Sequence, residues 1–256
     1  MYKELYRYYD TYGTYHTGKI YSDNRHFYKF DLEADDVFEL LKKIRPSVVI
    51  SALRGPFPAQ LEAHQLMVEY ATRSGCRLIF ISSANVFDAF SHYPSYEHDK
   101  TLSESIYGKL KIRCETLLMR NLPEKQYAIV RLPMVFGVGS PRVREIKNAL
   151  LLNEPIEVFP HLIINTTTDY KFSQQLHYII NRKLHGIFHL GSKDLIHHKE
   201  FVGEVVRVLD LDLKAIYKNV YTSNFDRYLA VLPKDNNLPK HLTITNEEVV
   251  LGSYKI

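Results

Sequence analysis

The sequence predicts an α/β protein with an open parallel sheet and a smaller C-terminal lobe. Three short runs, at 47–53, 77–83 and 126–131, are almost continuously apolar, as are strands that a parallel sheet buries on both faces. Apolar residues at helical spacing fill the stretches between these runs. Such alternation of strands with helices of about 10–15 residues is typical of right-handed crossover connections. The 256 residues suffice for one large domain or two small ones.

The first half of the chain begins with a helix candidate at 2–9, followed by strand candidates at 10–16 and 26–30. The next helix begins at Asp36, and Pro46 stops it. The elements that follow in this half are a strand at 47–53, a helix at 59–73, a strand at 77–83, a loop-like segment at 84–102, a helix at 103–120 and a strand at 126–131.

The pattern becomes looser after Gly139, which predicts a division of the chain into 1–140 and 141–256. The second part has shorter elements and mixed periodicity, as expected for a smaller lobe attached to the sheet. Its predicted elements are a helix at 143–152, short strands near 156–164, a helix at 169–182, a strand at 187–190, a helix at 199–209 and a strand near 213–217, before an irregular tail.

Composition excludes several classes of protein. The 33 Lys and Arg residues against 29 Asp and Glu form no basic block, so we expect no nucleic-acid partner. No run of 18 apolar residues occurs and the N-terminus has no signal-peptide pattern, so we expect a cytoplasmic protein without a membrane span. Cys76 and Cys114 are too few for a disulfide framework, and the histidines lack neighbouring ligands at metal spacing. We therefore expect no metal site.

Three features of the first half combine into a candidate site. Ser83 stands at the end of a predicted strand, on the carboxyl edge where open α/β sheets bind ligands. Tyr107 and Lys111 share one face of the helix that follows, because they are four residues apart. The next strand runs out through Pro133 into a loop at the same edge. A Tyr-x-x-x-Lys pair alone is also compatible with ordinary packing, and the combination is what favours a site.

These residue types suit the reduction of a ketone. A phenol with a pKa near 10 is a poor acid or base at neutral pH, and a nearby lysine ammonium would lower that pKa. A serine hydroxyl can hold a carbonyl oxygen while the phenol of Tyr107 donates a proton to it. Hydride from a nicotinamide would then complete the reduction.

Six segments together resemble the extended short-chain dehydrogenase/reductase superfamily, and within it the dTDP-4-dehydrorhamnose reductase branch. They cover most of the chain, and the last 40 residues carry the resemblance least. The segments are PSVVISAL (46–53), LIFISSANVFDA (78–89), YEHDKTLSESIYGKLKIRCE (96–115), IVRLPMVFG (129–137), NTTTDY (165–170) and GIFHLGSKD (186–194).

The resemblance implies a Rossmann-type domain at 1–140 that binds NAD(P), and a substrate-binding lobe at 141–256. It implies a triad in which Ser83 holds the substrate carbonyl, Tyr107 is the general acid, and Lys111 holds the nicotinamide ribose and lowers the pKa of Tyr107. The cofactor-binding positions implied are Asp31, Leu32, Ser51, Ala52, Leu53, Tyr107, Lys111 and Pro133. Those implied to face the substrate are Asn85 and Val86.

The function implied is the NAD(P)H-dependent reduction of a keto group on a nucleotide-linked sugar, by a chain that could form a homodimer. The alternative is a non-catalytic protein of the same fold that binds a sugar nucleotide or a dinucleotide and acts as a regulator. Ala84-Asn85 stands where the branch usually has Asp-Tyr, which supports the alternative. The complete Ser83, Tyr107 and Lys111 set supports the enzyme.

The glycine-rich turn of a dinucleotide site is not found in the sequence. The chain has 11 glycines where average usage of about 7% would supply about 18, and Gly13 and Gly18 follow the first helix candidate instead of opening it. We therefore expect that the sequence begins just after the phosphate loop, through N-terminal truncation, and that the first strand of the sheet is missing. That strand would be central, so its two neighbours would lack a hydrogen-bonding partner.

The cofactor is expected to be NADP or NAD. No acidic residue ends the predicted strand at 10–16, where one would bind the ribose of NAD. Tyr15, His16, Lys19 and Arg25 would suit a 2′-phosphate and favour NADP, although a solvated loop has the same composition.

Overall fold

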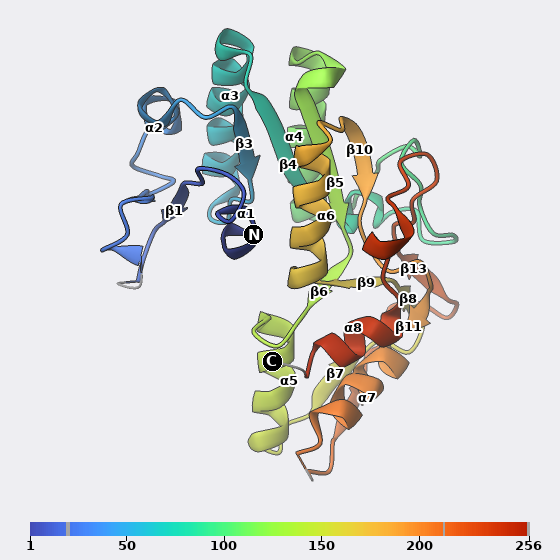
Figure 1. Cartoon of the computed structure of the whole chain (residues 1–256). Coiled ribbons are helices and arrows are strands. Elements are labelled where there is room, and N and C mark those ends of the chain that lie inside the picture. Colours follow the sequence, from blue (N-terminus) through green and yellow to red (C-terminus); the bar gives the residue numbers. More distant parts are fainter. Residues whose placement is uncertain (19–20, 212, 255–256) are drawn as a thin grey trace.

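The computed structural model describes residues 1–18, 21–211 and 213–254 and contains a central parallel sheet of four strands. The sheet order is β10-β5-β4-β3 (Figure 1). The middle strands β4 and β5 pair in parallel over six residues, from Leu78 opposite Tyr127 to Ser83 opposite Leu132. The predicted α/β class with a parallel sheet is thereby confirmed. The strands are β3 (Val48–Ser51), β4 (Arg77–Ser83), β5 (Tyr127–Leu132) and β10 (Gly186–His189).

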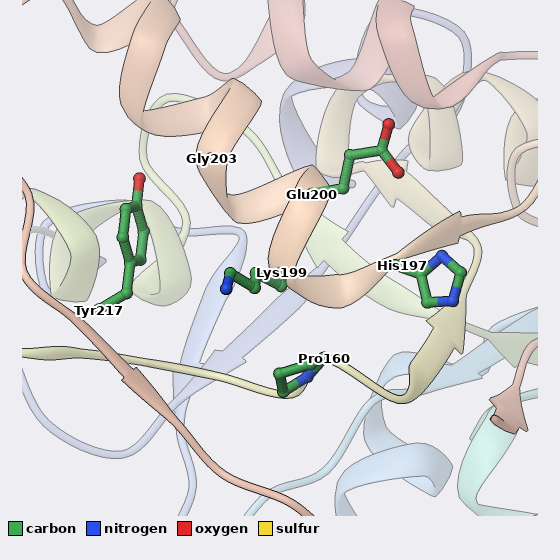
Figure 2. A pocket seen from close by; sticks show the side chains of 6 residues that line it. All are labelled: Pro160, His197, Lys199, Glu200, Gly203 and Tyr217. Carbon is green, nitrogen blue, oxygen red and sulfur yellow. The ribbon is translucent and has the colours of Figure 1, made fainter. Parts of the chain in front are cut away.

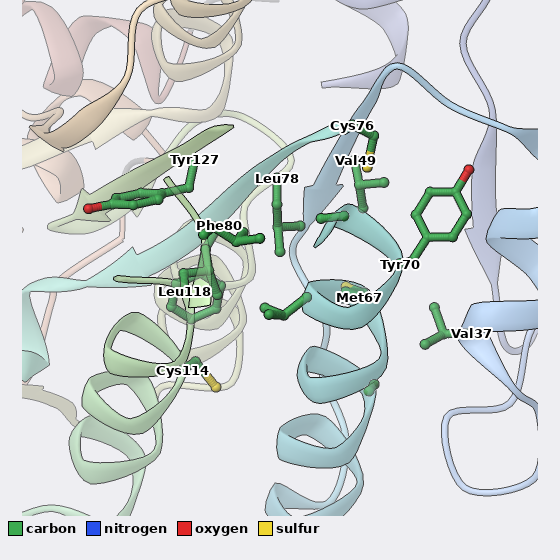
Figure 3. Close-up of a cluster of buried hydrophobic side chains, with 14 of the residues drawn as sticks. Val37, Val49, Met67, Tyr70, Cys76, Leu78, Phe80, Cys114, Leu118 and Tyr127 are labelled. Atoms are coloured by element: carbon green, nitrogen blue, oxygen red, sulfur yellow. The ribbon is translucent and has the colours of Figure 1, made fainter. Parts of the chain in front are cut away.

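Helices cover both faces of this sheet, which is why its strands are apolar throughout. Leu78 and Phe80 of β4 are fully buried in the cluster formed with three helices on one face (Figure 3). Ile79, between them, is fully buried on the other face, because successive side chains of a strand point in opposite directions. The first face carries α2 (Val37–Ile44), α3 (Phe57–Ser74) and α4 (Ile106–Asn121), and the second carries α6 (Asp169–Asn181).

Local sequence signals fix the ends of these helices. Asp36 caps α2 by accepting a hydrogen bond from the backbone N–H of Phe38 at 2.7 Å, and α2 ends at Arg45 before Pro46, as predicted. Gly75 ends α3 in the left-handed conformation, with φ of 72°. The predicted strand at 77–83 agrees with β4 in both bounds.

The N-terminal segment contains a two-stranded sheet of its own. Its helix α1 (Tyr2–Leu5) is shorter than the helix predicted over 2–9, and β1 (Gly13–Tyr15) pairs in parallel with β2 (Phe27–Lys29). Within the described ranges no strand pairs with the second edge of β1 or with the outer edge of β3. In the strand order 3-2-1-4-5-6 of dinucleotide-binding sheets, the first strand would join these two edges. The described residues contain no strand in that position.

The second lobe lies below the sheet in Figure 1 and has its own apolar core, to which helices and short strands contribute. Two elements from this part of the chain belong to the central sheet layer, since β10 pairs with β5 and α6 packs against the same sheet. The division predicted near residue 140 stays a prediction. The strands are β6 (Met134–Phe136), β7 (Ile156–Val158), β8 (Leu162–Ile164), β9 (Thr166–Thr168), β11 (Ile196–His197), β12 (Tyr217–Asn219) and β13 (Arg227–Leu229). The helices are α5 (Pro141–Leu151), α7 (His198–Leu209) and α8 (Asn246–Gly252).

Two of the hollows in the described part of the chain lie away from the carboxyl edge of β4. One of about 400 Å³ lies in the second lobe, between Pro160, the first turn of α7 and Tyr217 of β12 (Figure 2). The other, of about 600 Å³, is lined by residues from the ends of α2 and α3, among them Lys42 and Arg45. Of the helices in the described part of the chain, none is both long and apolar enough to span a bilayer.

Candidate active site

The candidate site is centred on Ser83, the last residue of β4, at the carboxyl edge of the sheet. Its hydroxyl donates a hydrogen bond to Asn85 Oδ1 at 2.9 Å and accepts one from the Asn85 backbone N–H at 3.2 Å. These two bonds cap the short 3-10 helix η2 (Ala84–Phe87), which begins as β4 ends. Asn85 therefore fixes the direction of the Ser83 hydroxyl. Val86 is fully buried against Val231, so its side chain does not reach the surface of the site as the resemblance implied.

The start of α4 is fixed against η2 and the turn that follows it. Ser105 caps α4 by accepting a hydrogen bond from the Gly108 backbone N–H at 3.0 Å, and it donates to Asp88 Oδ2 at 2.6 Å. A Cβ at Gly108 would lie 2.3 Å from the backbone oxygen of Asn85, which is closer than atoms can approach. Gly108 thus allows α4 to approach η2, and Tyr107 is brought to the side of β4 on which Ser83 lies.

Tyr107 and Lys111 face the same side of α4, as their spacing predicts. The Lys111 Nζ lies 5.6 Å from the centre of the Tyr107 ring and 4.8 Å from that of Phe80. It donates a hydrogen bond to the Ile81 carbonyl oxygen at 3.1 Å. Tyr107 is 40% exposed, whereas Lys111 is only 5% exposed. The phenol is therefore accessible to a ligand, and the ammonium lies beneath it.

The pKa of Tyr107 does not move in the predicted direction. Partial burial raises the pKa of this phenol above its usual value, and a hydrogen bond with Ser83 and the positive charge of Arg54 oppose the rise without cancelling it. Burial also lowers the pKa of the Lys111 ammonium, and the neighbouring Cys114 and Glu115 act in the opposite direction. The expected fall of the Tyr107 pKa toward neutrality is wrong for the chain by itself. Tyr107 keeps its proton at neutral pH.

The positions implied for the cofactor divide into accessible and buried ones. Ala52 is exposed, and Leu53 is half-buried in the loop after β3. Ser51 is buried, and its hydroxyl forms a 2.8 Å hydrogen bond with His64 Nε2 instead of facing the edge. Pro133 is buried against Gly191, so its ring is not exposed at the site either.

Asp31 and Leu32 follow β2, at the other end of the implied cofactor site, and both are half-buried. The Asp31 carboxylate accepts a hydrogen bond from the Glu33 backbone N–H at 3.0 Å and lies 3.4 Å from His16 Nε2. The hydrogen bond from Glu33 is the main reason that the pKa of Asp31 falls below its usual value, and His16 lowers it further. Lys19, also predicted here, lies outside the described residues.

Residues 56–238 match the RmlD substrate binding domain family, and this range is well over half of the chain. The chain belongs to the RmlD substrate binding domain family. No curated protein matches it. The match begins in the loop before α3 and includes Ser83, Tyr107 and Lys111. The family match agrees with the resemblance that the sequence motifs predicted, and the fold matches that of solved dTDP-4-dehydrorhamnose reductases.

Solved structures share the fold at low sequence identity. A dTDP-4-dehydrorhamnose reductase from Clostridium acetobutylicum is 20% identical, with a TM-score of 0.73 over 95% of this chain and 97% of that one. The Bacillus anthracis reductase, solved in complex with NADP, is 19% identical, with a TM-score of 0.71 over 88% and 87%. MoeE5, solved with UDP-glucuronic acid and NAD, is 18% identical, with a TM-score of 0.71 over 90% and 84%. At these identities the likeness establishes the Rossmann-type fold.

The residues of this RmlD-family chain fit the nicotinamide-ribose end of a dinucleotide, because an exposed phenol and a buried ammonium adjoin the Ser83 hydroxyl at one edge. The residues that the structure describes provide no glycine-rich turn for the pyrophosphate. Helix α1 has only four residues, begins after Met1 without a side-chain cap, and is followed, not preceded, by Gly13. Nor does the described part of the chain gather three His, Cys, Asp or Glu side chains as a metal site would.

Sequence reasoning missed a buried polar network directly behind the site. The Arg131 guanidinium, 2% exposed, donates from Nε and Nη2 to the two carboxylate oxygens of Glu115, at 3.0 and 2.7 Å. Ser82 donates to the same carboxylate at 2.5 Å, and Arg131 Nη1 donates to the Glu97 carbonyl oxygen at 2.9 Å. The sequence predicted Arg131 only as the last residue of the strand at 126–131. A charged residue inside an apolar strand was the signal that pointed to a buried partner.

Glu97, in the segment 84–102 that the sequence predicted to be loop-like, is also buried. It is 1% exposed, and its carboxylate accepts hydrogen bonds from the backbone N–H groups of Lys234, Asp235 and Asn236, the closest at 2.9 Å. Glu97 therefore attaches the loop before α4 to the C-terminal segment. A carboxylate that satisfies consecutive backbone donors is structural, and nothing in its local sequence distinguishes it from a solvated charge.

Proposed function

We propose that this protein is an NAD(P)H-dependent reductase of a keto group on a nucleotide-linked sugar, similar to dTDP-4-dehydrorhamnose reductase. The observation that carries the proposal is the convergence of Ser83, Tyr107 and Lys111 at the carboxyl edge of the sheet. An exposed phenol beside a directed hydroxyl, with an ammonium beneath the ring, is suited to proton transfer to a carbonyl oxygen.

In the proposed reaction Ser83 holds the substrate carbonyl oxygen. To do so, the hydroxyl must turn its single proton from Asn85 Oδ1, to which it donates at 2.9 Å, to the carbonyl oxygen. Tyr107 gives its proton to that oxygen. The phenol is protonated at neutral pH, as a general acid must be, and the burial that raises its pKa makes it a weaker acid in the chain by itself. The nicotinamide supplies the hydride when it is bound.

Lys111 supports this proton transfer through its charge. Its ammonium lies 5.6 Å from the centre of the Tyr107 ring, so it stabilises the phenolate that remains after the proton has left. A shift of Nζ from the Ile81 carbonyl oxygen would allow it to hold the ribose hydroxyls of the cofactor. Both NADP and NAD remain candidates. Of the described residues that were predicted to suit a 2′-phosphate, His16 lies 3.4 Å from an Asp31 carboxylate oxygen.

The second candidate is a non-catalytic binding or regulatory protein of the same fold. The described residues provide no glycine-rich turn for a pyrophosphate, and this observation favours the second candidate. Ala84 is buried and Asn85 is engaged with Ser83, at the positions where the branch usually has Asp-Tyr. Both candidates predict that the chain binds a nucleotide ligand, and only the reductase predicts turnover. Measuring binding and turnover together therefore distinguishes them.

The test combines binding and turnover on the purified chain. NADPH and NADH are titrated by their fluorescence, and oxidation of the reduced cofactor is followed with dTDP-4-dehydrorhamnose. We expect Tyr107→Phe to bind cofactor as the wild type does and to lose about 10²–10⁴-fold in turnover, because the proton donor is removed. Tyr93→Phe, at a side chain that is 79% exposed, is the matched control and should retain full turnover.

Three results decide between the readings. Turnover that survives Tyr107→Phe would refute the proposed role of that residue. Binding of cofactor or sugar nucleotide by the wild type without any turnover would favour the regulatory protein. A wild type that binds neither reduced cofactor nor dTDP would exclude both.

A further inference from the structure

The loop between β3 and α3 borders both ends of the candidate site. Gly55 in this loop has φ of 138°, and its Cα faces Leu32, because a Cβ there would lie 3.0 Å from Leu32 Cδ2. On the other side, the ring of Phe57 lies 6.4 Å from the ring of Tyr107, centre to centre. Gln60 of α3 holds the loop by donating from Nε2 to the Gly55 carbonyl oxygen at 2.7 Å. The loop thus lies between Leu32 and Tyr107.

Arg54 is the charged residue of this loop. Its side chain is exposed, and within the described part of the chain it forms no hydrogen bond or ion pair. Arg54 directly precedes Gly55, which faces Leu32, and its positive charge lowers the pKa of both Tyr107 and Lys111. The carboxylate that raises the pKa of Lys111 is that of Glu115, and it is already paired with Arg131. Two cations at one sheet edge favour an anionic ligand.

We propose that Arg54 binds the diphosphate of a nucleotide ligand at this edge. This inference rests on the proposed function. It assigns a side chain to the diphosphate, for which the described residues provide no glycine-rich turn. A guanidinium can donate two parallel hydrogen bonds to phosphate oxygens, and it carries its charge at every working pH. Arg54 therefore supplies by a side chain part of the binding that a glycine-rich turn supplies by backbone N–H groups.

The position of the loop favours a dinucleotide as the source of the diphosphate. Open α/β sheets bind dinucleotides across the carboxyl ends of their strands. A dinucleotide that extends along this edge from Leu32, after β2, to Tyr107, beside β4, would cross the loop between them with its pyrophosphate. The diphosphate of a sugar nucleotide is the other source of the same chemistry, and the experiment distinguishes the two.

The experiment measures dissociation constants of NADPH and dTDP for Arg54→Ala, Arg54→Lys and Arg113→Ala. Arg113 is an exposed arginine on α4 that forms no ion pair or hydrogen bond with the described residues, so its variant has the same charge change. We expect Arg54→Ala to weaken NADPH binding about tenfold or more and to flatten its dependence on salt, because charge-assisted hydrogen bonds are lost. Arg54→Lys should lose less. Thermal unfolding should be unchanged in all three, since both arginines are exposed.

A tenfold loss for NADPH alone supports the dinucleotide as the ligand, and a loss for dTDP alone supports the sugar nucleotide. If Arg54→Ala binds both ligands as tightly as Arg113→Ala while the wild type binds at least one, the role of Arg54 is refuted and the proposed function stands. If the wild type binds neither ligand, the proposed function fails, and the role of Arg54 fails with it.

Discussion

Glu115→Gln should destabilise the protein strongly, although its side chain touches no ligand in the proposed mechanism. The carboxylate is 1% exposed and accepts two hydrogen bonds from the Arg131 guanidinium and one from Ser82. Glutamine preserves the shape and removes the charge. The Arg131 guanidinium then remains buried with the Glu97 carbonyl oxygen and His189 Nε2 as its other partners, and neither of them carries a negative charge.

The expected loss follows from the burial of both partners. Removing one member of a buried ion pair costs about 3–5 kcal/mol, because the other charge stays away from water without compensation. Domains are stable by about 5–15 kcal/mol, so the loss is a large fraction of the total. For a chain of this size, about 2–4 °C per kcal/mol converts the loss into a fall in Tm of about 6–20 °C.

Urea and thermal unfolding followed by circular dichroism measure this loss. Glu157→Gln is the matched control, since it breaks an ion pair with Lys218 in which both side chains are more than half exposed. That pair should contribute less than about 1 kcal/mol. Glu115→Leu combined with Arg131→Met removes both buried charges and should be more stable than Glu115→Gln alone. A Glu115→Gln variant within about 1 kcal/mol of the wild type would refute the reasoning.

Two further predictions concern stability. Burial lowers the pKa of His64 and His198 to about 4 and that of His189 to about 3, so below about pH 6.5 the unfolded chain binds protons that the folded chain does not. The free energy of unfolding should therefore fall as the pH decreases from 6.5 toward 4, by about 1.4 kcal/mol per pH unit for each histidine. Denaturant titrations at several pH values measure this free energy, which should change less with pH in His64→Gln than in the wild type. Gly108→Ala should cost about 1–3 kcal/mol, because its Cβ would overlap the Asn85 backbone oxygen. Gly203→Ala, where the nearest atom is 4.0 Å away in the middle of α7, should instead stabilise the protein by up to about 1 kcal/mol, and equal effects of the two substitutions would contradict this explanation.

The elements that could be predicted are those whose pattern reflects burial on known faces. The runs at 77–83 and 126–131 are apolar because helices cover both sides of β4 and β5, and their positions were predicted within one residue. Elements of the second lobe were harder, because three-residue strands such as β6 and β13 are too short to show a period. Helix α8 was missed in the tail although it has a readable signal. Thr245 and Glu248 form a capping box, with the Thr245 backbone N–H donating to Glu248 at 2.8 Å.

The candidate site was predictable where its geometry is local. Tyr107 and Lys111 are four residues apart on one helix, so their common face followed from helical periodicity alone. The buried network behind them joins Ser82, Glu115 and Arg131, which are far apart along the chain, and no local pattern indicates their contact. For the same reason the effect of Arg54 on Tyr107 could not be anticipated, because it depends on how the loop after β3 packs beside α4.

The sequence by itself determined the fold class, the order of the main strands and helices, and the residues that carry the candidate chemistry. These follow from periodicity and spacing, which are properties of neighbouring residues. Only the tertiary structure decided that Asn85 directs the Ser83 hydroxyl, that Tyr107 has a raised pKa, and that no described strand joins β1 to β3. Each of these depends on burial and on contacts between segments distant in the chain. Desolvation and hydrogen bonding depend on which groups lie close together in space, and the fold alone sets the distances between groups that are far apart in the sequence.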